Sequence, residues 1–363
     1  MLLNNDTTLS KTIMFLRFPL IVAVVFIHTG LEGIMINGTL LVNEGQFPIY
    51  GLLHHILTNE LARIAIPLFF FISGFLFFYH SDFSLETYGQ KLKKRARTLL
   101  IPYIFWNVVV FLLTLCSQLF LSSMLSGRYK LIANYDWQDW INLFWAHGDS
   151  GMPICYQFWF IRDLIIVIIF TPILHYIIKY CKVFSIFVLG TLWLFNLWFA
   201  IPGFNITAFF FFSFGAWFSI NKHNFIIDFC PMRWITTFMY LALVVLNTWL
   251  WHYKIIDNDY IHKIGIIVGL VAVASWTAYG ITKNHLPVSA FLAGSSFFVY
   301  AYHGMPAALV TKYWMKLLSP ISEWMMLVGY FLIPFFIVGV GVGIYALSRK
   351  YFPALTALVT GGR

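Results

Sequence analysis

Charged side chains are scarce in this sequence. Only 10% of its 363 residues are Asp, Glu, Lys or Arg, whereas 60% are hydrophobic and 20% aromatic. A water-soluble domain is about half apolar and about a quarter charged, so this composition excludes an ordinary soluble fold. No linker rich in Pro, Gly or Ser divides the chain. We therefore predict a single all-α integral membrane domain over residues 1–363.

Cysteines are also few, and their spacing carries no metal or disulfide signature. The four positions are Cys116, Cys155, Cys181 and Cys230. They form neither a disulfide framework nor a zinc motif, so no metal and no bound cofactor is expected. The net charge of +9 does not gather on a soluble basic patch, and no nucleic-acid partner is expected.

The N-terminal apolar run resembles a signal peptide because basic residues precede it. No small-residue cleavage site follows it, however. We therefore expect this segment to stay in the mature protein as its first membrane helix.

Long apolar runs occur throughout the chain. A helix needs roughly 20 mostly apolar residues to cross about 30 Å of hydrocarbon. Ten segments satisfy this requirement and predict a bundle of about ten transmembrane helices: residues 13–31, 62–80, 98–122, 157–178, 183–201, 203–220, 234–252, 263–281, 288–309 and 324–347.

The distribution of basic residues predicts which side of the membrane holds the termini. An even number of spans places both termini on one side, and cytoplasmic loops carry an excess of Lys and Arg. If the N-terminus is cytoplasmic, that side holds fifteen of the 23 basic residues: Lys11, Arg17, Lys91, Lys93, Lys94, Arg95, Arg97, Lys179, Lys182, Lys222, Arg233, Lys283, Arg349, Lys350 and Arg363. We therefore predict that both termini are cytoplasmic.

Arg17 and His28 are ionisable residues within the first predicted span. An ionisable side chain in the hydrocarbon layer costs about 2.5 kcal/mol or more, which makes each a functional candidate. Their spacing, about three helical turns, places both on one stripe of the helix, with His28 roughly 16 Å further toward the outer leaflet. A structural interpretation stays open, in which Arg17 snorkels to the interface and His28 bonds a neighbouring helix.

Two further spans carry polar residues in the outer half of the bilayer. Tyr300 and His303 share one stripe of the ninth span, with His303 at about the depth of His28. Arg162 and Asp163 open the fourth span, either as an interfacial ion pair or as part of a site. Because histidine exchanges protons near neutral pH, these residues indicate acid–base or acyl-transfer chemistry.

A dense basic cluster, KLKKRARTLLIPY, enters the third predicted span. Such a cluster binds anionic lipid headgroups or a phosphorylated small molecule, or serves only as a positive-inside signal. On the other side of the membrane, the long segments 32–61 and 123–156 either shape an external acceptor site or anchor the interface through Trp137, Trp140 and Trp145.

Together these motifs resemble the acyltransferase-3 family of bacterial membrane-bound O-acyltransferases over nearly the whole chain. LRFPLIVAVVFIHTG matches the first-helix arginine–histidine motif, and Ser73, Gly74 and Phe75 in IPLFFFISGFLFF match the Ser-Gly-aromatic motif. KKRARTLLIPYIFW is similar to the paired-basic motif, although Lys94 departs from the two-arginine form. FWFIRDLIIVIIFTPIL, FFSFGAWFS and SSFFVYAYHGMP resemble the later signatures, in the expected order.

The resemblance implies a membrane-only, multi-pass protein of the bacterial cytoplasmic membrane. It also implies that the protein moves an acyl group, usually acetyl, from cytoplasmic acyl-CoA to a hydroxyl of a surface glycan or its lipid-linked precursor. The implied donor-binding residues are Lys94, Arg95 and Arg97, with Arg17 positioning the donor or neutralising charge. His28 is the implied general base or transient acyl carrier. The expected supports for the acceptor or the oxyanion are Arg162, Asp163, His303, Tyr300 and Ser73.

Two other functions stay open. A transporter or flippase for a glycolipid or small anion also uses buried His and Arg, and Pro172 and Pro334 offer only weak candidates for broken helices. A non-catalytic scaffold would use the polar residues for helix packing alone. The sequence identifies neither the acceptor sugar, nor the acyl group, nor the oligomeric state.

Overall fold

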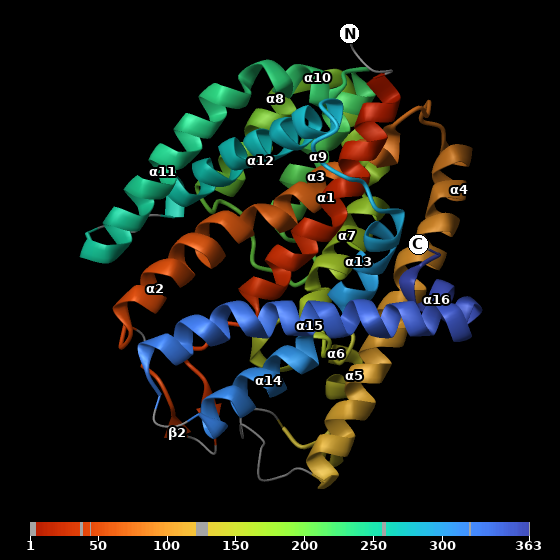
Figure 1. The fold of residues 1–363 in the computed structure, drawn as a ribbon. Coiled ribbons are helices and arrows are strands. Elements are labelled where there is room, and N and C mark those ends of the chain that lie inside the picture. Colours follow the sequence, from red (N-terminus) through yellow and green to blue (C-terminus); the bar gives the residue numbers. More distant parts are fainter. Residues whose placement is uncertain are drawn as a thin grey trace. The chain divides into compact units, whose positions relative to one another are not determined.

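The computed structural model describes residues 5–362, except 37–38, 44, 121–129, 256–258 and 319–320. Helices dominate these residues (Figure 1), and the strands among them are the short antiparallel pair β1 (Met35–Ile36) and β2 (Thr39–Leu40). The all-α prediction is confirmed. The helices are α1 (Asn5–Ile27), α2 (Pro48–His54), α3 (Ala65–Phe78), α4 (Leu85–Arg95), α5 (Ile101–Phe120), α6 (Trp137–Asn142), α7 (Trp159–Ile169), α8 (Thr171–Leu194), α9 (Ile206–Ile220), α10 (Phe225–Phe229), α11 (Arg233–Tyr253), α12 (Asp259–Thr282), α13 (Ala290–Tyr302), α14 (Gly304–Leu317), α15 (Glu323–Tyr351) and α16 (Pro353–Thr360).

Several helical stretches are long and apolar enough to cross a membrane. Within the described residues there are seven: Asp6–Ile27, Pro48–Phe78, Leu85–Phe120, Thr171–Leu194, Phe225–Tyr253, Asp259–Thr282 and Glu323–Tyr351. The second joins α2 and α3 through the π-helix η1 (His55–Leu61) and the 3-10 helix η2 (Ala62–Ile64), and the third joins α4 and α5 through the π-helix η3 (Ala96–Leu100). The protein is therefore a multi-pass membrane protein.

The remaining predicted spans fall on shorter or broken helices. α9 and α13 are apolar but short. Segment 157–178 covers α7 and the first part of α8, and segment 183–201 begins just after Lys182, where the backbone of α8 leaves the helical region (φ 47°, ψ −130°). The count of ten spans and the cytoplasmic position of both termini stay predictions. The predicted end of span three at residues 121–122 and the C-terminal Arg363 lie outside the described residues.

The second and third helical stretches begin before the predicted spans. The second helical stretch begins at Pro48 rather than at residue 62, and the third begins at Leu85 rather than at residue 98. Polar residues, including Glu60 and the basic cluster, end the apolar run in each case, but the backbone continues as helix through them.

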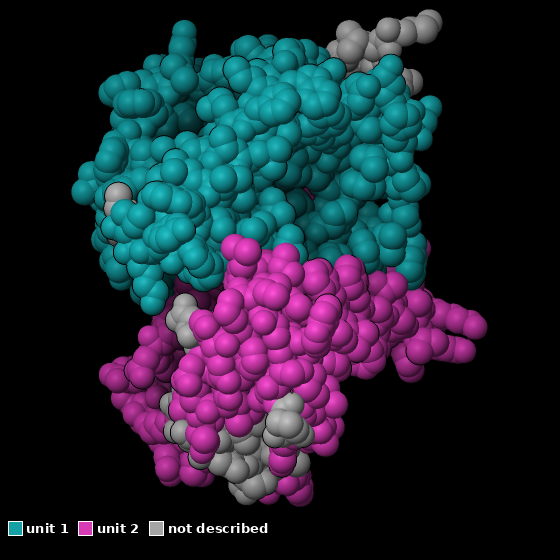
Figure 2. Space-filling model, turned by 60° about the vertical axis from the view of Figure 1, so that its left-hand side comes forward, with its two compact units in different colours: residues 1–24, 55–92, 166–296 teal, residues 25–54, 93–165, 297–363 magenta. Residues whose placement is uncertain are grey.

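Contacts divide the chain into two compact units, coloured separately in Figure 2. Unit 1 comprises residues 1–24, 55–92 and 166–296, and unit 2 comprises residues 25–54, 93–165 and 297–363. The boundaries fall inside α1, α4, α7 and α13 and between α2 and η1, so each unit combines segments that are distant in the sequence. The single domain over 1–363 stays a prediction.

Unit 1 is built around the close approach of α3 and α9. A Cβ atom at Gly74 would lie 1.9 Å from the carbonyl oxygen of Phe212, and one at Gly215 would lie 1.9 Å from that of Phe71. Each glycine thus admits the backbone of the opposite helix. The two family-motif glycines therefore serve close helix packing.

Unit 2 is built around α15, which packs against α2, α14 and α16. Glu323 at the start of α15 accepts hydrogen bonds from the backbone N–H groups of Ile49 (2.6 Å) and Tyr50 (3.1 Å). These groups lie in the first turn of α2, where no helical carbonyl reaches them and where negative charge is favourable. A distant carboxylate therefore caps α2.

The segment after α5, predicted to lie on the outer side, contains the short helix α6. The Asp136 side chain accepts hydrogen bonds from the N–H groups of Gln138 and Asp139, and Lys130 contacts both carboxylates. Backbone hydrogen bonding from Asp139 lowers the pKa of Asp136, and the Lys130 side chain lowers that of Asp139. Trp137 and Trp140 are exposed, which favours interfacial anchoring for these two tryptophans.

Candidate functional site

Two histidines from distant parts of the chain meet in unit 2. His28 directly follows α1, and His303 lies at the break between α13 and α14. Their ring centroids are 5.3 Å apart. The ring of His28 also makes an edge contact with Tyr156, at 5.0 Å between centroids. The sequence predicts similar depths for the two histidines, and the structure places their rings side by side.

The hydrogen bonding of His303 identifies its basic nitrogen. The side chain is fully buried, and its Nδ1 lies 2.7 Å from the carbonyl oxygen of Tyr300. Because a carbonyl only accepts, Nδ1 carries the proton and donates it. Nε2 has no hydrogen-bond partner among the described residues. The neutral ring therefore keeps a free lone pair on Nε2.

Tyr300, Gln157 and Gly304 surround this histidine and fix its position. The Tyr300 hydroxyl donates to the carbonyl of Gln157, and the Gln157 side chain donates to the carbonyl of Ala301 (3.0 Å). A Cβ at Gly304 would lie 2.5 Å from Gln157 Oε1. Glycine at 304 thus lets the Gln157 amide pack directly beside the helix break.

Asn107 of α5 positions the segment that carries Tyr156 and Gln157. Its buried side chain accepts a hydrogen bond from the backbone N–H of Cys155 (3.1 Å) and donates to the carbonyl of Tyr103 (2.8 Å). The amide therefore ties the 3-10 turn η7 (Tyr156–Phe158) to α5 at the level of the histidine pair.

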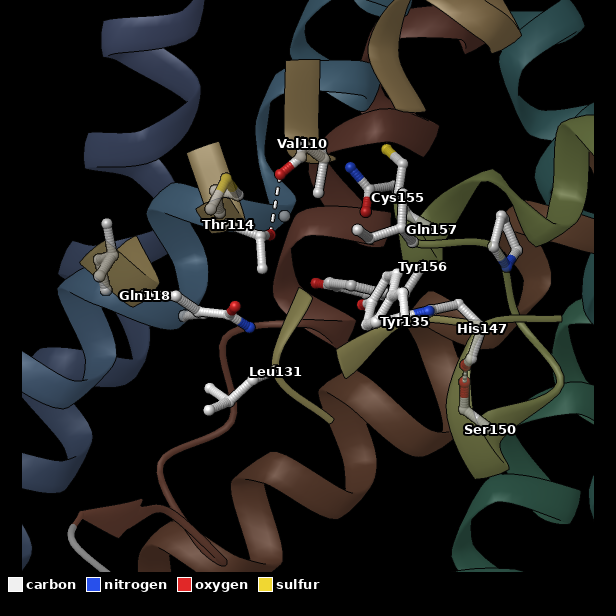
Figure 3. Close-up of a pocket in the computed structure, with 16 residues that line it drawn as sticks. Val110, Thr114, Gln118, Leu131, Tyr135, His147, Ser150, Cys155, Tyr156 and Gln157 are labelled. Atoms are coloured by element: carbon white, nitrogen blue, oxygen red, sulfur yellow. Dashed lines mark hydrogen bonds between the residues drawn. The ribbon is translucent and has the colours of Figure 1, made fainter. Parts of the chain in front are cut away.

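A cavity of about 370 Å³ adjoins the site within unit 2. Such a volume lies within the range of small-molecule pockets, about 300–1,000 Å³. Figure 3 shows the rings of Tyr135, Tyr156 and His147 gathered on one side, and Thr114 and Gln118 of α5 on the other. The wall also includes Gly304, the residue after His303. The cavity therefore reaches Tyr156, which contacts His28, and Gly304, which follows His303.

His147 contributes a titratable group to this cavity. Its Nε2 lies 3.3 Å from the hydroxyl of Tyr135. Burial lowers the pKa of His147 below its ordinary value, so the ring stays neutral at neutral pH and can exchange hydrogen bonds without a fixed charge.

Arg162 and Asp163 form a buried pair in α7. Arg162 Nε donates to Asp163 Oδ1 (2.9 Å), and Nη1 donates to the carbonyls of Trp145 and Gly151 (2.8 Å for Gly151). The arginine therefore holds the loop that presents His147 to the cavity. Its predicted direct contact with acceptor or oxyanion stays a prediction.

From Lys93 onward, the basic cluster belongs to the same unit as the histidine pair, whereas Lys91 belongs to unit 1. Lys94 and Arg97 are exposed and Arg95 is half-buried. Arg97 and Asn107 lie in one continuous helical stretch, at a separation of roughly 15 Å along its axis. Further along the same helix, Val110, Thr114 and Gln118 line the cavity. The helical stretch from Lys94 through α5 thus passes the basic residues, the histidine pair and the cavity in that order.

Arg17 and Ser73 belong to unit 1 and are both half-buried. Among the described residues, no hydrogen bond or ion pair involves the guanidinium of Arg17. A partly buried cation is costly without an anionic partner, which agrees with a ligand-binding role. The functional roles predicted for both residues stay predictions.

Sequence reasoning missed Tyr156, Gln157 and Asn107. They lie near span ends, where aromatic and amide residues are common, and only the folded chain brings them to the histidines. The break at His303 was missed as well; Gly304 and Pro306 directly after it were the available signal.

The profile of a protein family described as "Acyltransferase domain" matches residues 11–346, a range that includes every predicted site residue. The chain belongs to the acyltransferase-3 family. This acyltransferase-3 protein is similar to the succinoglycan biosynthesis protein ExoH of Rhizobium meliloti (strain 1021), with 27% identity over 176 residues. The aligned region covers 48% of the chain and 44% of ExoH, so it spans less than half of that relative. No solved structure matches the chain. Family membership thus places the described helices in a family whose model is an acyltransferase domain.

Proposed function

We propose that this acyltransferase-3 protein transfers an acyl group, acetyl in the first instance, from acyl-CoA to a hydroxyl of a cell-surface glycan or its lipid-linked precursor in the bacterial cytoplasmic membrane. The observation that carries the proposal is the pairing of His28 with His303 beside a ligand-sized cavity. Succinoglycan in the name of the relative ExoH supports a glycan as acceptor.

The donor binds just before α5, at the end of α4 and in η3. Arg95, Arg97 and Lys94 contact the phosphates of acyl-CoA, since guanidinium groups suit bidentate phosphate contacts. The roughly 15 Å of helix between Arg97 and Asn107 allows an extended pantetheine arm to carry the thioester toward His28. Arg17, which lies in unit 1 and bonds no other described residue, stays the predicted further cation for the donor.

His28 acts as the general base. Its imidazole takes the proton of the acceptor hydroxyl while the hydroxyl oxygen attacks the thioester carbonyl carbon. The new C–O bond forms as the C–S bond breaks, and the departing CoA thiolate takes up the proton. His303 stabilises the charge on the neighbouring His28 through its unprotonated Nε2. An acyl-histidine on His28 is the alternative route, and trapping of acylated protein would distinguish it.

The acceptor occupies the cavity. The aromatic faces of Tyr135 and Tyr156 suit the apolar face of a sugar ring, and Gln118, His147 and Gln157 offer hydrogen bonds to its hydroxyls. Arg162 acts here as a positioning residue, because it bonds the carbonyls of Trp145 and Gly151 on either side of His147.

Labelled donors test the reaction. Membranes with equal amounts of wild type or His28→Ala receive radiolabelled acetyl-CoA or succinyl-CoA, and label is counted in the extracted glycans. A general base contributes about 10²–10⁴-fold, so His28→Ala should lose at least about 100-fold of the activity. His252→Ala, at an exposed histidine of α11, is the control and should retain full transfer. Full transfer by His28→Ala would rule out this mechanism.

A transporter is the second candidate, and the helix break at His303 favours it, because broken helices line transport sites. It predicts movement of a glycolipid or anion across the membrane without label in the glycan.

For the acyltransferase, mass spectrometry of surface glycans with and without the gene identifies the acyl group and the modified sugar.

A further inference from the structure

A second polar cluster lies in unit 1, formed by residues that the proposed mechanism does not use. At its centre is Glu60, whose side chain is 3% exposed although it belongs to the apolar stretch Pro48–Phe78. Its Oε1 lies 3.5 Å from His55 Nε2, and its Oε2 lies 3.4 Å from His262 Nδ1. The Asn247 amide donates to Oε1. A buried acid in a membrane span is a functional candidate.

The backbone around Glu60 is irregular and is held by α11. His55 and Glu60 lie in the π-helix η1, and π-helical turns occur frequently at functional sites. The Tyr240 hydroxyl donates to the carbonyl of Glu60 (3.2 Å). The Trp251 ring stacks on His55 at 4.3 Å between centroids. The cluster is therefore packed in place from a second helix.

The nitrogens of His55 lack hydrogen-bond partners. The side chain is 6% exposed, and neither Nδ1 nor Nε2 makes a hydrogen bond to another described residue. The contact with Glu60 falls short of hydrogen-bond geometry, which leaves polar atoms buried at a cost. A proton between these two groups would convert the contact into a charge-assisted hydrogen bond.

Charge balance indicates that the cluster binds one proton. With Glu60 ionised and both histidines neutral, the cluster carries a buried negative charge; with two added protons it would be positive. One added proton makes it neutral, which is the least costly state in a low dielectric. The neighbouring charges leave this balance in place, because Lys263 pairs with Asp259 at 2.6 Å and, among the described residues, Arg63 forms no ion pair with Glu60.

We propose that His55, Glu60 and His262 form a proton-binding site that holds one proton among them and exchanges it through His262. The side chain of His262 is 22% exposed, against 6% for His55 and 3% for Glu60. The path therefore runs from His262 Nδ1, across the Glu60 carboxylate, to His55 Nε2. Among the described residues, no group of His, Cys, Asp or Glu has the arrangement of a metal site.

The site makes the folding stability depend on pH in two directions. In the unfolded chain, histidine titrates near about 6.5 and glutamate near about 4.3. Below about pH 6 the unfolded chain binds more protons than the cluster, so stability rises with pH. Above about pH 7 the cluster retains a proton that the unfolded chain has released, so stability falls. The ratio of folded to unfolded protein changes by up to about tenfold per pH unit on each side.

Thermal unfolding of the full chain in detergent, measured between about pH 5 and 9, tests the site. Wild type should lose stability on the alkaline side. Glu60→Gln should not show that loss, because no carboxylate is left to neutralise. Glu86→Gln, at an exposed carboxylate of α4, is the matched control and should keep the wild-type profile. If Glu60→Gln loses as much stability on the alkaline side as wild type does, the proposal is overturned.

His262→Gln provides a second variant, since its partly exposed position tolerates substitution if Glu60→Gln does not fold. Loss of one imidazole weakens the binding of the proton, so the loss of stability on the alkaline side should begin at a lower pH than in wild type. A profile identical to that of wild type counts against the site. Stabilisation by added Zn²⁺ that Glu60→Gln abolishes would assign a metal instead and overturn the proton assignment. None of these measurements depends on acyl transfer, so their failure leaves the proposed function untouched.

Discussion

A single backbone carbonyl determines the chemistry available to His303. The carbonyl of Tyr300 accepts the Nδ1 proton, so the buried Nε2 presents a lone pair near His28. If Nε2 carried the proton instead, a buried donor without a partner would result, at a cost of about 1–3 kcal/mol. The local helix break thus selects the tautomer that can assist a neighbouring base.

Replacing His303 should separate this role from simple packing. We expect His303→Ala to lower kcat by about 100-fold, within the range of acid–base contributions, with little change in KM for the donor. Tyr300→Phe keeps the carbonyl that accepts from His303 and loses only the hydrogen bond from its hydroxyl to Gln157. Its kcat should therefore fall by about tenfold or less, near the value of one hydrogen bond. Steady-state kinetics with labelled acyl-CoA measures both.

Added imidazole provides the control for His303→Ala. If the missing ring acts in proton transfer, free imidazole in the space that it leaves should restore part of kcat. If kcat falls equally in His303→Ala and Tyr300→Phe and imidazole restores none of it, His303 has only a structural role.

The candidate histidines were predictable from the sequence because ionisable residues stand out in apolar runs. His28 and His303 were identified in this way, and the structure brings them together. Tyr156, Gln157 and Asn107 carry no comparable signal, because their types are common at span ends and their importance arises from contacts between distant segments. Glu60 was assigned to a loop, since polarity rather than backbone hydrogen bonding set the predicted boundary at residue 62.

Among the helices, α3 and α9 show how two motif glycines specify one contact. Gly74→Ala and Gly215→Ala should each destabilise the protein by about 2 kcal/mol, the usual cost of overpacking, because the new methyl group would meet a backbone carbonyl at 1.9 Å. Gly89→Ala in α4 is the control, since nothing lies within 4 Å of its Cβ position. It should be neutral or stabilising by up to about 1 kcal/mol.

Thermal unfolding in detergent compares the three glycine variants. A Gly74→Ala protein as stable as Gly89→Ala would contradict the close contact of α3 and α9.

Most helices were predictable from their apolar runs, but their breaks were not. The irregular positions at Lys182, His303 and η1 depend on packing against other helices, which a local hydrophobic pattern does not encode. The second and third helical stretches begin before the predicted spans for a related reason. Helical hydrogen bonding continues through Glu60 and the basic cluster after hydrophobicity has ended.

Across the entire chain, the number of membrane crossings determines whether the termini share one side. Seven helical stretches are long enough to cross in the described residues, and an odd number would place the termini on opposite sides. The ten spans predicted from the sequence, an even number, place both in the cytoplasm, where most basic residues then lie. The two counts therefore make opposite predictions for the C-terminal end.

Single cysteines in a background without Cys116, Cys155, Cys181 and Cys230 distinguish these counts. We expect Lys11→Cys and Lys350→Cys, at exposed positions of α1 and α15, to react with a membrane-impermeant maleimide only after permeabilisation. Asp149→Cys, in the outer segment before α7, should react in intact cells and serves as the positive control. Reaction of Lys350→Cys in intact cells, with Lys11→Cys protected, would require an odd number of crossings. Reaction of Lys11→Cys in intact cells would reverse the orientation and place the basic cluster away from cytoplasmic acyl-CoA, which would remove the basis for the proposed donor site.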